Sequence, residues 1–378
     1  MNNKKELSLY IHIPFCKQKC FYCDFPSYAS IDYLREDYVE ALCKEIEEKA
    51  SKYIIKSIFI GGGTPSYLET KEIIKLLNSI NKLNLKEDME FSMECNPGAL
   101  EEEKLKAMLK GGVNRISMGL QAVQNSLLED IGRIHSFKQF EENFNMARKV
   151  GFKNINVDLM FGLPNQKVDE WKESLEVIAR LNPEHISAYS LIVEEGTPFY
   201  RLWENNKLIL PEEDDERTMY DITKEILEGY GYRQYEISNY AKEGFECFHN
   251  KVYWKCEEYL GVGSASTSFI DGKRIKNIEN VKEYIDRISI DKDVTEEITI
   301  NTLEDSMEEF VFMGLRLING ISLEKFRKRF GVNIESIYKD VIDKNINKKL
   351  LVIENDRLRL TKKGVELSNS VMSDFILT

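Results

Sequence analysis

The sequence predicts an α/β fold with a parallel β-sheet and helical crossovers, followed by a C-terminal part of different character. Short apolar runs alternate with amphipathic helical segments from residue 6 to about residue 192. Six β-then-α units favour a parallel sheet, because parallel neighbours need a crossover connection, usually a helix. With 378 residues, 42% of them hydrophobic, the chain can form two or three units with substantial cores.

The expected elements follow from the spacing of apolar residues. Strands are expected at the short apolar runs Leu7–Ile13, Ile55–Ile60, Glu90–Glu94, Arg115–Gly119, Asn154–Met160 and His185–Ile192. Helices are expected where apolar residues recur at helical spacing, at Tyr33–Lys49, Lys71–Lys82, Glu102–Lys110, Phe137–Val150 and Glu170–Leu181. The alternation alone fits either an open sheet or a closed barrel.

The alternation stops after residue 192. A proline-led acidic helix start at Pro211 precedes a helix at Met219–Leu227, and Tyr232–Tyr240 reads as an aromatic-rich strand. The glycine-containing stretch at residues 261–266 is expected to be a flexible loop. We therefore interpret residues 1–195 as the α/β unit and residues 196–300 as a mixed α+β extension.

Residues 301–378 form the third expected unit. Leu303–Leu317 and Leu323–Phe330 have helical periodicity, and residues 350–362 are typical of a β-hairpin that turns at Glu354–Asp356. Helices followed by such a hairpin suggest a winged-helix-like end. The small excess of Lys and Arg in residues 322–378 is too weak to indicate DNA binding, so we expect a packing or partner surface.

Composition excludes several classes of protein. The net charge of −12 argues against binding to bulk nucleic acid. No run approaches the ~20 apolar residues of a membrane span, and the polar start of the chain lacks a secretory segment. Seven cysteines, three of them clustered, indicate a reducing compartment. We expect a cytoplasmic protein, and peripheral contact with a membrane stays open.

Cys16, Cys20 and Cys23 form a C-x3-C-x2-C arrangement directly after the first apolar run. An odd number of clustered thiols does not form a disulfide framework. Structural zinc normally takes four protein ligands, and the loop contains no fourth Cys or His. Because [4Fe–4S] clusters usually take four cysteines, three would leave one iron open to a small molecule. The alternative is three unligated cysteines in a loop.

Polar or glycine residues stand at the end of several expected strands. Gly61–Gly63 and Thr64 follow the second strand, Glu94 ends the third, Gln121 follows the fourth and Asp158 lies near the end of the fifth. The carboxyl ends of parallel strands meet at one edge, where barrels of this kind build their active sites. A tight turn for the glycines and a capping role for Glu94 are the structural alternatives.

The motif from Tyr10 through Cys16, Cys20 and Tyr22 to Cys23 resembles the radical S-adenosylmethionine (SAM) superfamily, in its coproporphyrinogen-oxidase-like branch. The resemblance implies a partial (β/α)6 barrel that is open on one side. It also implies that the three cysteines hold a [4Fe–4S] cluster, whose open iron binds SAM. Cleavage of SAM by an electron from the cluster would require an electron donor.

The resemblance assigns further residues to the cofactors. Glycines after the second strand would bind the SAM amino group, Arg133 its carboxylate and Asp158 the ribose hydroxyls. Aromatic contacts would come from two tyrosines. The full expected cofactor-binding set is Tyr10, Tyr22, Asp24, Gly62, Gly63, Thr64, Glu94, Gln121, Arg133 and Asp158. Cys43 and Cys95 are expected to be buried bystanders.

Two members of the branch are distinguished by sequence. The oxygen-independent coproporphyrinogen III oxidases carry a fourth cysteine two residues after the third, together with a longer region before the cluster. Here Phe25 occupies that position and the cluster motif begins at residue 16. The chain is closest to the HemW heme-chaperone family, which has C-x3-C-x2-C-x-F and His-Asn-x-x-Tyr-Trp, as at residues 249–254.

This second resemblance implies a protein that binds heme and hands it to an acceptor hemoprotein, and oxidase activity is not expected. The alternatives are a coproporphyrinogen III oxidase and a radical SAM enzyme with another substrate. His249, beside Phe248, Tyr253 and Trp254, suits an axial ligand of heme iron, although a lone histidine is more often structural. Cys247 is a competing ligand.

Overall fold

The computed structural model describes residues 4–377, and its main feature is a twelve-stranded sheet in the order β12-β11-β10-β9-β1-β2-β3-β4-β5-β6-β8-β7. Six consecutive parallel strands form its centre: β1 (Glu6–Ile13), β2 (Ile54–Gly62), β3 (Asn84–Cys95), β4 (Arg115–Gln121), β5 (Ile155–Phe161) and β6 (His185–Ser190). The crossovers contain α1 (Arg35–Ala50), α2 (Thr70–Ile80), α3 (Glu102–Lys110), α4 (Asn125–Asp130), α5 (Phe137–Val150) and α6 (Val168–Leu181), with short 3-10 turns at Asp32–Leu34 and Pro65–Tyr67. The six predicted strands and the helical crossovers between them are confirmed.

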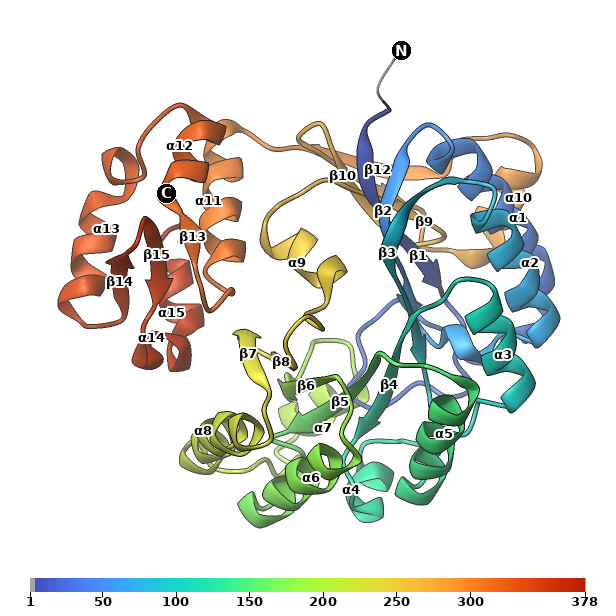
Figure 1. Ribbon diagram of the computed structural model, residues 1–378, viewed down its shortest axis with the longest axis horizontal. Helices are drawn as coiled ribbons and strands as arrows, with labels where there is room; N and C mark the ends of the chain where they lie inside the picture. The colour runs from blue at the N-terminus through green and yellow to red at the C-terminus, as the bar shows by residue number, and fades with distance from the viewer. Residues whose placement is uncertain (1–3, 378) are drawn as a thin grey trace.

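The sheet does not close on itself, since β12 and β7 lie at opposite ends of the strand order. Beside β1, the parallel strand β9 (Tyr259–Val262) is followed by the antiparallel strands β10 (Thr267–Ile270), β11 (Lys273–Asn277) and β12 (Thr295–Ile300). Beside β6, β8 (Asn239–Ala241) and β7 (Arg233–Glu236) form an antiparallel hairpin. The partial barrel is therefore confirmed. In Figure 1 the sheet curves, with α1, α2, α3, α5 and α6 along its outer side.

Two predictions in the extension were wrong. The stretch predicted as one strand at Tyr232–Tyr240 is instead the β7–β8 hairpin, because the chain reverses between Glu236 and Asn239. The stretch predicted as a flexible loop begins in β9, whose Gly261 pairs with Tyr10 of β1. A Cβ atom at Gly261 would lie 2.3 Å from the carbonyl oxygen of Thr267, so this glycine permits close strand packing rather than flexibility.

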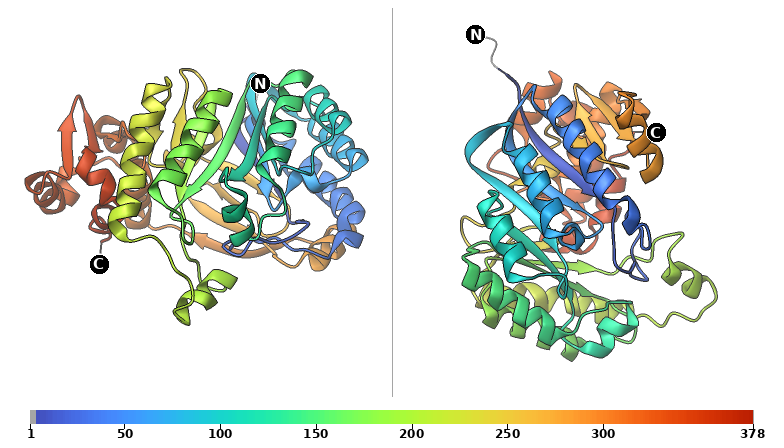
Figure 2. Two further views of the ribbon diagram at one scale, coloured as in Figure 1. Left: turned by 90° about the horizontal axis from the view of Figure 1, so that it is seen from below. Right: turned by 90° about the vertical axis from the view of Figure 1, so that its right-hand side faces the viewer.

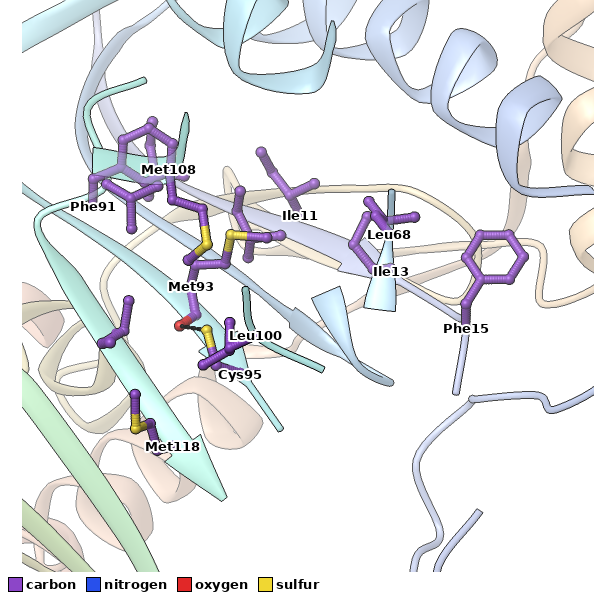
Figure 3. Packing of buried hydrophobic residues seen from close by; sticks show 14 of the residues in the cluster. Ile11, Ile13, Phe15, Leu68, Phe91, Met93, Cys95, Leu100, Met108 and Met118 are labelled. Atoms are coloured by element: carbon purple, nitrogen blue, oxygen red, sulfur yellow. Dashed lines mark hydrogen bonds between the residues drawn. The ribbon is translucent and has the colours of Figure 1, made fainter. Parts of the chain in front are cut away.

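The alternation of residues along the central strands separates an apolar core from a polar interior. In β1, Leu7, Leu9, Ile11 and Ile13 are fully buried against the helical layer. Figure 3 shows Ile11 and Ile13 in the same cluster as Phe91 and Met93 of β3 and Met108 of α3. Because strand side chains alternate between faces, Tyr10 and His12 point to the opposite, inner side of the sheet.

The extension adds α7 (Pro198–Glu204), α8 (Glu213–Gly229), α9 (Phe248–Trp254) and α10 (Val281–Ser289). The α7 segment projects from the body in both views of Figure 2, and its Phe199 amide donates to the carbonyl of Phe21 in the loop after β1. In contrast to the outer helices, α9 lies on the inner side of the curved sheet in Figure 1 and contacts β2.

The C-terminal part contains α11 (Leu303–Gly314), α12 (Leu323–Phe330), α13 (Glu335–Asn347), α14 (Lys362–Glu366) and α15 (Ser368–Ser373). Its small sheet has the order β13 (Ile321–Ser322), β15 (Arg357–Leu360), β14 (Leu351–Glu354). The predicted hairpin is confirmed, with positive φ at Asn355 and Asp356 in its turn. These elements share a separate apolar core, and Figure 1 shows them to one side of the sheet. Within residues 4–377, the helices include none with the length and apolar character needed to cross a membrane.

Candidate functional site

A cavity of about 420 Å³ lies at the carboxyl ends of the central strands. Its volume falls within the range of small-molecule sites in proteins. The cavity brings together most of the residues predicted from sequence to bind cofactors. Those on its wall are Cys16, Cys20, Tyr22, Cys23, Asp24, Gly62, Gly63, Thr64, Glu94, Gln121, Arg133 and Asp158.

The three clustered cysteines lie on the loop between β1 and α1, and all three are free thiols. The loop folds back on itself, because the Cys16 amide donates to the Tyr28 carbonyl and the Tyr28 amide to the Pro14 carbonyl. Burial raises the pKa of the Cys16 and Cys23 thiols. Three thiols around one cavity fit a [4Fe–4S] cluster with an open iron, because each iron takes one thiolate. Among the described residues, no three His, Cys, Asp or Glu side chains converge on a single metal ion.

Glu94 is held at the end of β3 by the glycine run that follows β2. The Gly62 amide donates to Glu94 Oε2 at 3.1 Å. Gly62 has φ of 110°, and a Cβ atom there would lie 2.4 Å from the His12 ring, so only glycine fits. Burial, and then the nearby Asp158 carboxyl, raise the pKa of Glu94 to about 8. A cationic ligand group such as an ammonium would stabilise its ionised form.

Arg133 is a half-buried arginine whose guanidinium has spare donors. Its Nη1 donates to Asn96 Oδ1 at 3.2 Å, its Nε has no partner, and no carboxylate of residues 4–377 lies within 4.0 Å of it. Gly119 makes room for it, because a Cβ atom there would lie 2.8 Å from Arg133 Nη2. An unpaired cation that is partly removed from water is costly, so this arrangement fits a ligand that brings a carboxylate.

Gln121 lies beside Arg133 at an irregularity in the β4–β5 pairing. Its backbone has φ of 79°, which is uncommon for a residue other than glycine, and its buried Oε1 has no hydrogen-bond partner. Strained backbone and unsatisfied polar atoms cluster at functional sites. Gln121 therefore offers a free acceptor to a ligand in this cavity.

Asp158 is oriented by neighbours that the sequence did not single out. Ser117 Oγ donates to Asp158 Oδ2 at 3.0 Å, and Asn156 Nδ2 donates to Oδ1 at 2.7 Å. Burial raises the pKa of Asp158, and these hydrogen bonds oppose that shift. Asn96, which receives the Arg133 contact, was likewise not assigned a role. The missed signal was polar residues at every second position of buried strands, as in Ser117-x-Gly119-x-Gln121.

Tyr10 lines a second cavity of about 240 Å³ that lies deeper in the partial barrel. Its hydroxyl lies 3.0 Å from His12 Nδ1, and His12 Nε2 lies 2.8 Å from the Pro26 carbonyl in the cysteine loop. Since the carbonyl only accepts, Nε2 carries the proton and Nδ1 accepts from Tyr10. His12 thus links β1 to the loop that carries the cysteines.

His249 lies in α9, fully buried and outside the two cavities. Its Nδ1 lies 2.9 Å from Ser57 Oγ and its Nε2 lies 3.0 Å from Tyr253 Oη. Burial lowers the pKa of His249 to about 3. Both ring nitrogens are occupied, so this geometry favours a structural role, and ligation of heme by His249 stays a prediction. Cys247 is also buried, with its Sγ 3.3 Å from Glu90 Oε1.

The other residues of the His-Asn-x-x-Tyr-Trp motif face different parts of the molecule. Asn250 lines the deeper cavity. The guanidinium of Arg316, in the C-terminal part, lies over the Trp254 ring. Its Cζ atom is 4.4 Å from the centroid of that ring. The motif therefore joins the barrel interior, the deeper cavity and the C-terminal core.

Comparison with known proteins agrees with this architecture. The radical SAM superfamily profile matches residues 10–178, and the HemN C-terminal domain profile matches residues 301–367. The solved structure of coproporphyrinogen III oxidase (HemN) from Escherichia coli, a radical SAM enzyme, has a TM-score of 0.86 at 22% identity. That match covers 99% of this chain and 90% of the oxidase. At this identity the likeness establishes the fold.

Similarity in sequence is greater to two heme chaperones. The heme chaperone HemW of Bacillus subtilis is 40% identical over 374 residues, covering 98% of this chain and 99% of that protein. The heme chaperone HemW of Lactococcus lactis is 38% identical over 375 residues, covering 99% and 98%. Identity of this degree along the whole chain establishes the family, and the chain belongs to the HemW heme-chaperone family of the radical SAM superfamily.

Proposed function

We propose that this protein is a heme chaperone, which binds heme and transfers it to acceptor hemoproteins. The observation that carries the proposal is 40% identity to a HemW heme chaperone over 98% of the chain. Phe25, in place of the oxidases' fourth cysteine, supports the chaperone over the coproporphyrinogen III oxidase.

The protein carries a [4Fe–4S] cluster and SAM, as membership of the superfamily implies. In our proposal, Cys16, Cys20 and Cys23 hold the cluster, and SAM binds at its open iron. The bound cluster would supply the electron for any reductive cleavage of SAM, and that electron would come from a separate donor. Arg133 would orient the SAM carboxylate, Glu94 the amino group and Asp158 the ribose hydroxyls.

Three further points belong to the proposal. Residues 1–195 would form the cofactor-binding barrel, residues 196–300 the extension with the His249 motif, and residues 301–378 the winged-helix-like end. The separate C-terminal core supports the last boundary. We place the protein in the cytoplasm, where reduced thiols persist, and peripheral contact with a membrane would bring it near membrane-bound acceptors.

One anaerobic reconstitution tests the function. The purified protein is loaded with iron, sulfide and SAM, then assayed for heme uptake by its Soret absorption and for turnover of coproporphyrinogen III. We expect heme uptake and its transfer to an added apo-hemoprotein, without oxidase product. Turnover of coproporphyrinogen III without heme uptake would establish the oxidase alternative instead.

A further inference from the structure

The interior of the partial barrel is hollow and polar beneath the cysteine-lined cavity. Every central strand contributes to this lumen, and so does α9 through Asn250. Its lining residues are Tyr10, Phe25, Phe59, Gly62, Glu94, Arg115, Ser117, Asn156, Asp158, Ser187, Tyr189 and Asn250. Six of them, including Glu94, Asp158 and Tyr189, also line the larger cavity, so the two spaces adjoin.

Arg115 is the one cationic residue among those that line this lumen. Its side chain is 1% exposed, and it lies on the same face of β4 as Ser117 and Gly119. Nη1 makes a long hydrogen bond of 3.4 Å to Ser92 Oγ, and Nε has no partner. Within residues 4–377, no carboxylate oxygen lies within 4.0 Å of the guanidinium. A buried cation without a paired anion is costly, which points to an anionic ligand.

The carboxyl groups that share the lumen are already engaged. Both oxygens of Asp158 accept hydrogen bonds, from Ser117 and Asn156, and Glu94 accepts from the Gly62 amide. Glu90, close to Arg115, caps the start of α9 by accepting from the Phe248 and His249 amides. None of these acids forms an ion pair with Arg115, so its donors other than the one bonded to Ser92 stay available.

We propose that the lumen binds a ligand carboxylate, held by Arg115 with Asn250 beside it. Guanidinium matches carboxylate geometry through two parallel hydrogen bonds. A lumen of about 240 Å³ admits a carboxylate-bearing side arm while excluding a whole macrocycle. The inference rests on the proposed function, in which the ligand is heme. Heme carries two propionates, and we assign one of them to Arg115. A separate small carboxylate is the other source of the same chemistry.

The test compares heme with heme dimethyl ester, in which both propionates are blocked. Both are titrated into reconstituted wild type and Arg115→Gln, and the acid-to-ester affinity ratio is compared between the proteins. The ratio isolates the carboxylate contribution, as in a double-mutant cycle. We expect the wild-type preference for the acid to fall about ten- to a hundredfold in Arg115→Gln. Arg115→Lys keeps the charge but loses the two parallel hydrogen bonds. Its acid-to-ester affinity ratio should lie between those of wild type and Arg115→Gln.

A second arm addresses the other source of a carboxylate. Sodium propionate should raise the melting temperature of wild type above that in sodium chloride of equal ionic strength, and should not do so for Arg115→Gln. A propionate effect without any difference between heme and its ester would assign the lumen to a separate small carboxylate. If neither arm depends on Arg115, the proposal is overturned.

Controls separate this inference from folding and from the proposed function. Arg148→Gln removes a half-buried arginine that pairs with Glu184, and it should leave both arms unchanged because neither residue lines the lumen. If Arg115→Gln fails to retain its cluster, Asn250→Asp tests the same site, because an added carboxylate should repel the ligand and lower the acid-to-ester ratio. If wild type takes up no heme, the proposed function fails, while the propionate arm still tests the lumen.

Discussion

Glu94 Oε2 accepts a hydrogen bond from the Gly62 backbone amide at 3.1 Å, which ties the carboxyl end of β3 to that of β2. A Cβ atom at the neighbouring Gly61 would lie 2.9 Å from the same oxygen. The Glu94 carboxyl group is therefore held against the backbone of Gly61 and Gly62, where a side chain larger than that of glycine would not fit. This preorganisation explains how a flexible residue type becomes a fixed acceptor in the cavity.

The first prediction concerns the affinity for SAM. Glu94→Gln and Arg133→Gln should each weaken SAM binding about ten- to a hundredfold, because each removes a charge-assisted contact of ~1.5–3 kcal/mol. Calorimetry on reconstituted protein measures the affinity, and iron analysis should give an unchanged cluster content. Glu103→Gln, on the exposed surface of α3, is the matched control. Unaltered affinity in both site variants would show that neither residue binds SAM.

The second prediction concerns pH. Burial, with the Asp158 carboxyl nearby, raises the pKa of Glu94 from 4.5 to about 8 in the folded protein. Between these values the folded protein keeps a proton that the unfolded chain has lost. The resulting stabilisation is complete below pH 4.5 and is lost as the pH rises through about 8. Without SAM, the free energy of unfolding should fall by up to about 1.4 kcal/mol per pH unit.

Glu94→Gln supplies the reference for this measurement, because glutamine does not titrate. In denaturant titrations at each pH, the free energy of unfolding of wild type should fall relative to that of Glu94→Gln as the pH rises from 5 to 8. A difference that stays constant over this range would mean that Glu94 ionises as a solvent-exposed acid does.

The third prediction concerns the cluster. Cys16→Ala, Cys20→Ala and Cys23→Ala should each abolish assembly of [4Fe–4S], since two thiolates are too few to hold it. Iron and sulfide analysis after anaerobic reconstitution measures the loss. Cys43→Ala and Cys95→Ala are the controls, although Cys95 reaches the cavity wall. Figure 3 shows Cys95 Sγ directed at the Met93 carbonyl, 3.7 Å away. A full cluster in Cys20→Ala would refute the assignment.

The barrel could be predicted because its signals are local. Each strand of the β1–β6 series is an apolar run, and each crossover helix repeats apolar residues at helical spacing. The predicted helices at Glu102–Lys110 and Phe137–Val150 match α3 and α5. The hairpin of β7 and β8 could not be found in this way, because both strands are short and the turn at Ile237–Ser238 contains neither Gly nor Pro.

The wall of the larger cavity was predictable because strand ends carry its residues, as Glu94 and Gln121 do. The polar lumen was not, because Arg115, Asn156 and Asn250 meet only when six strands and α9 come together. His249 illustrates the same limit. Its aromatic neighbours in sequence suggested an axial ligand of heme iron, whereas α9 turns the imidazole into the core against Ser57 and Phe59.

The last prediction tests His249 through its partner Tyr253. If His249 has a structural role and its Nε2 stays bonded to Tyr253 Oη, Tyr253→Phe removes that hydrogen bond. It should then lower the free energy of unfolding by about 1 kcal/mol. The Soret band of bound heme should then stay unchanged. If His249 instead ligates heme iron, Nε2 must leave Tyr253 Oη. Removing that hydroxyl would then strengthen heme binding, a change in the opposite direction.

His249→Ala and Cys247→Ala complete this test. From the geometry we expect His249→Ala to destabilise the protein by about 2–4 kcal/mol, because it empties a buried site and breaks two hydrogen bonds. Denaturant titration measures that loss, and absorption spectra of heme-loaded protein report the ligand. A Soret shift in His249→Ala without one in Tyr253→Phe or Cys247→Ala would contradict the structural role. It would mean that α9 rearranges when heme binds, since the imidazole reaches neither cavity in this conformation.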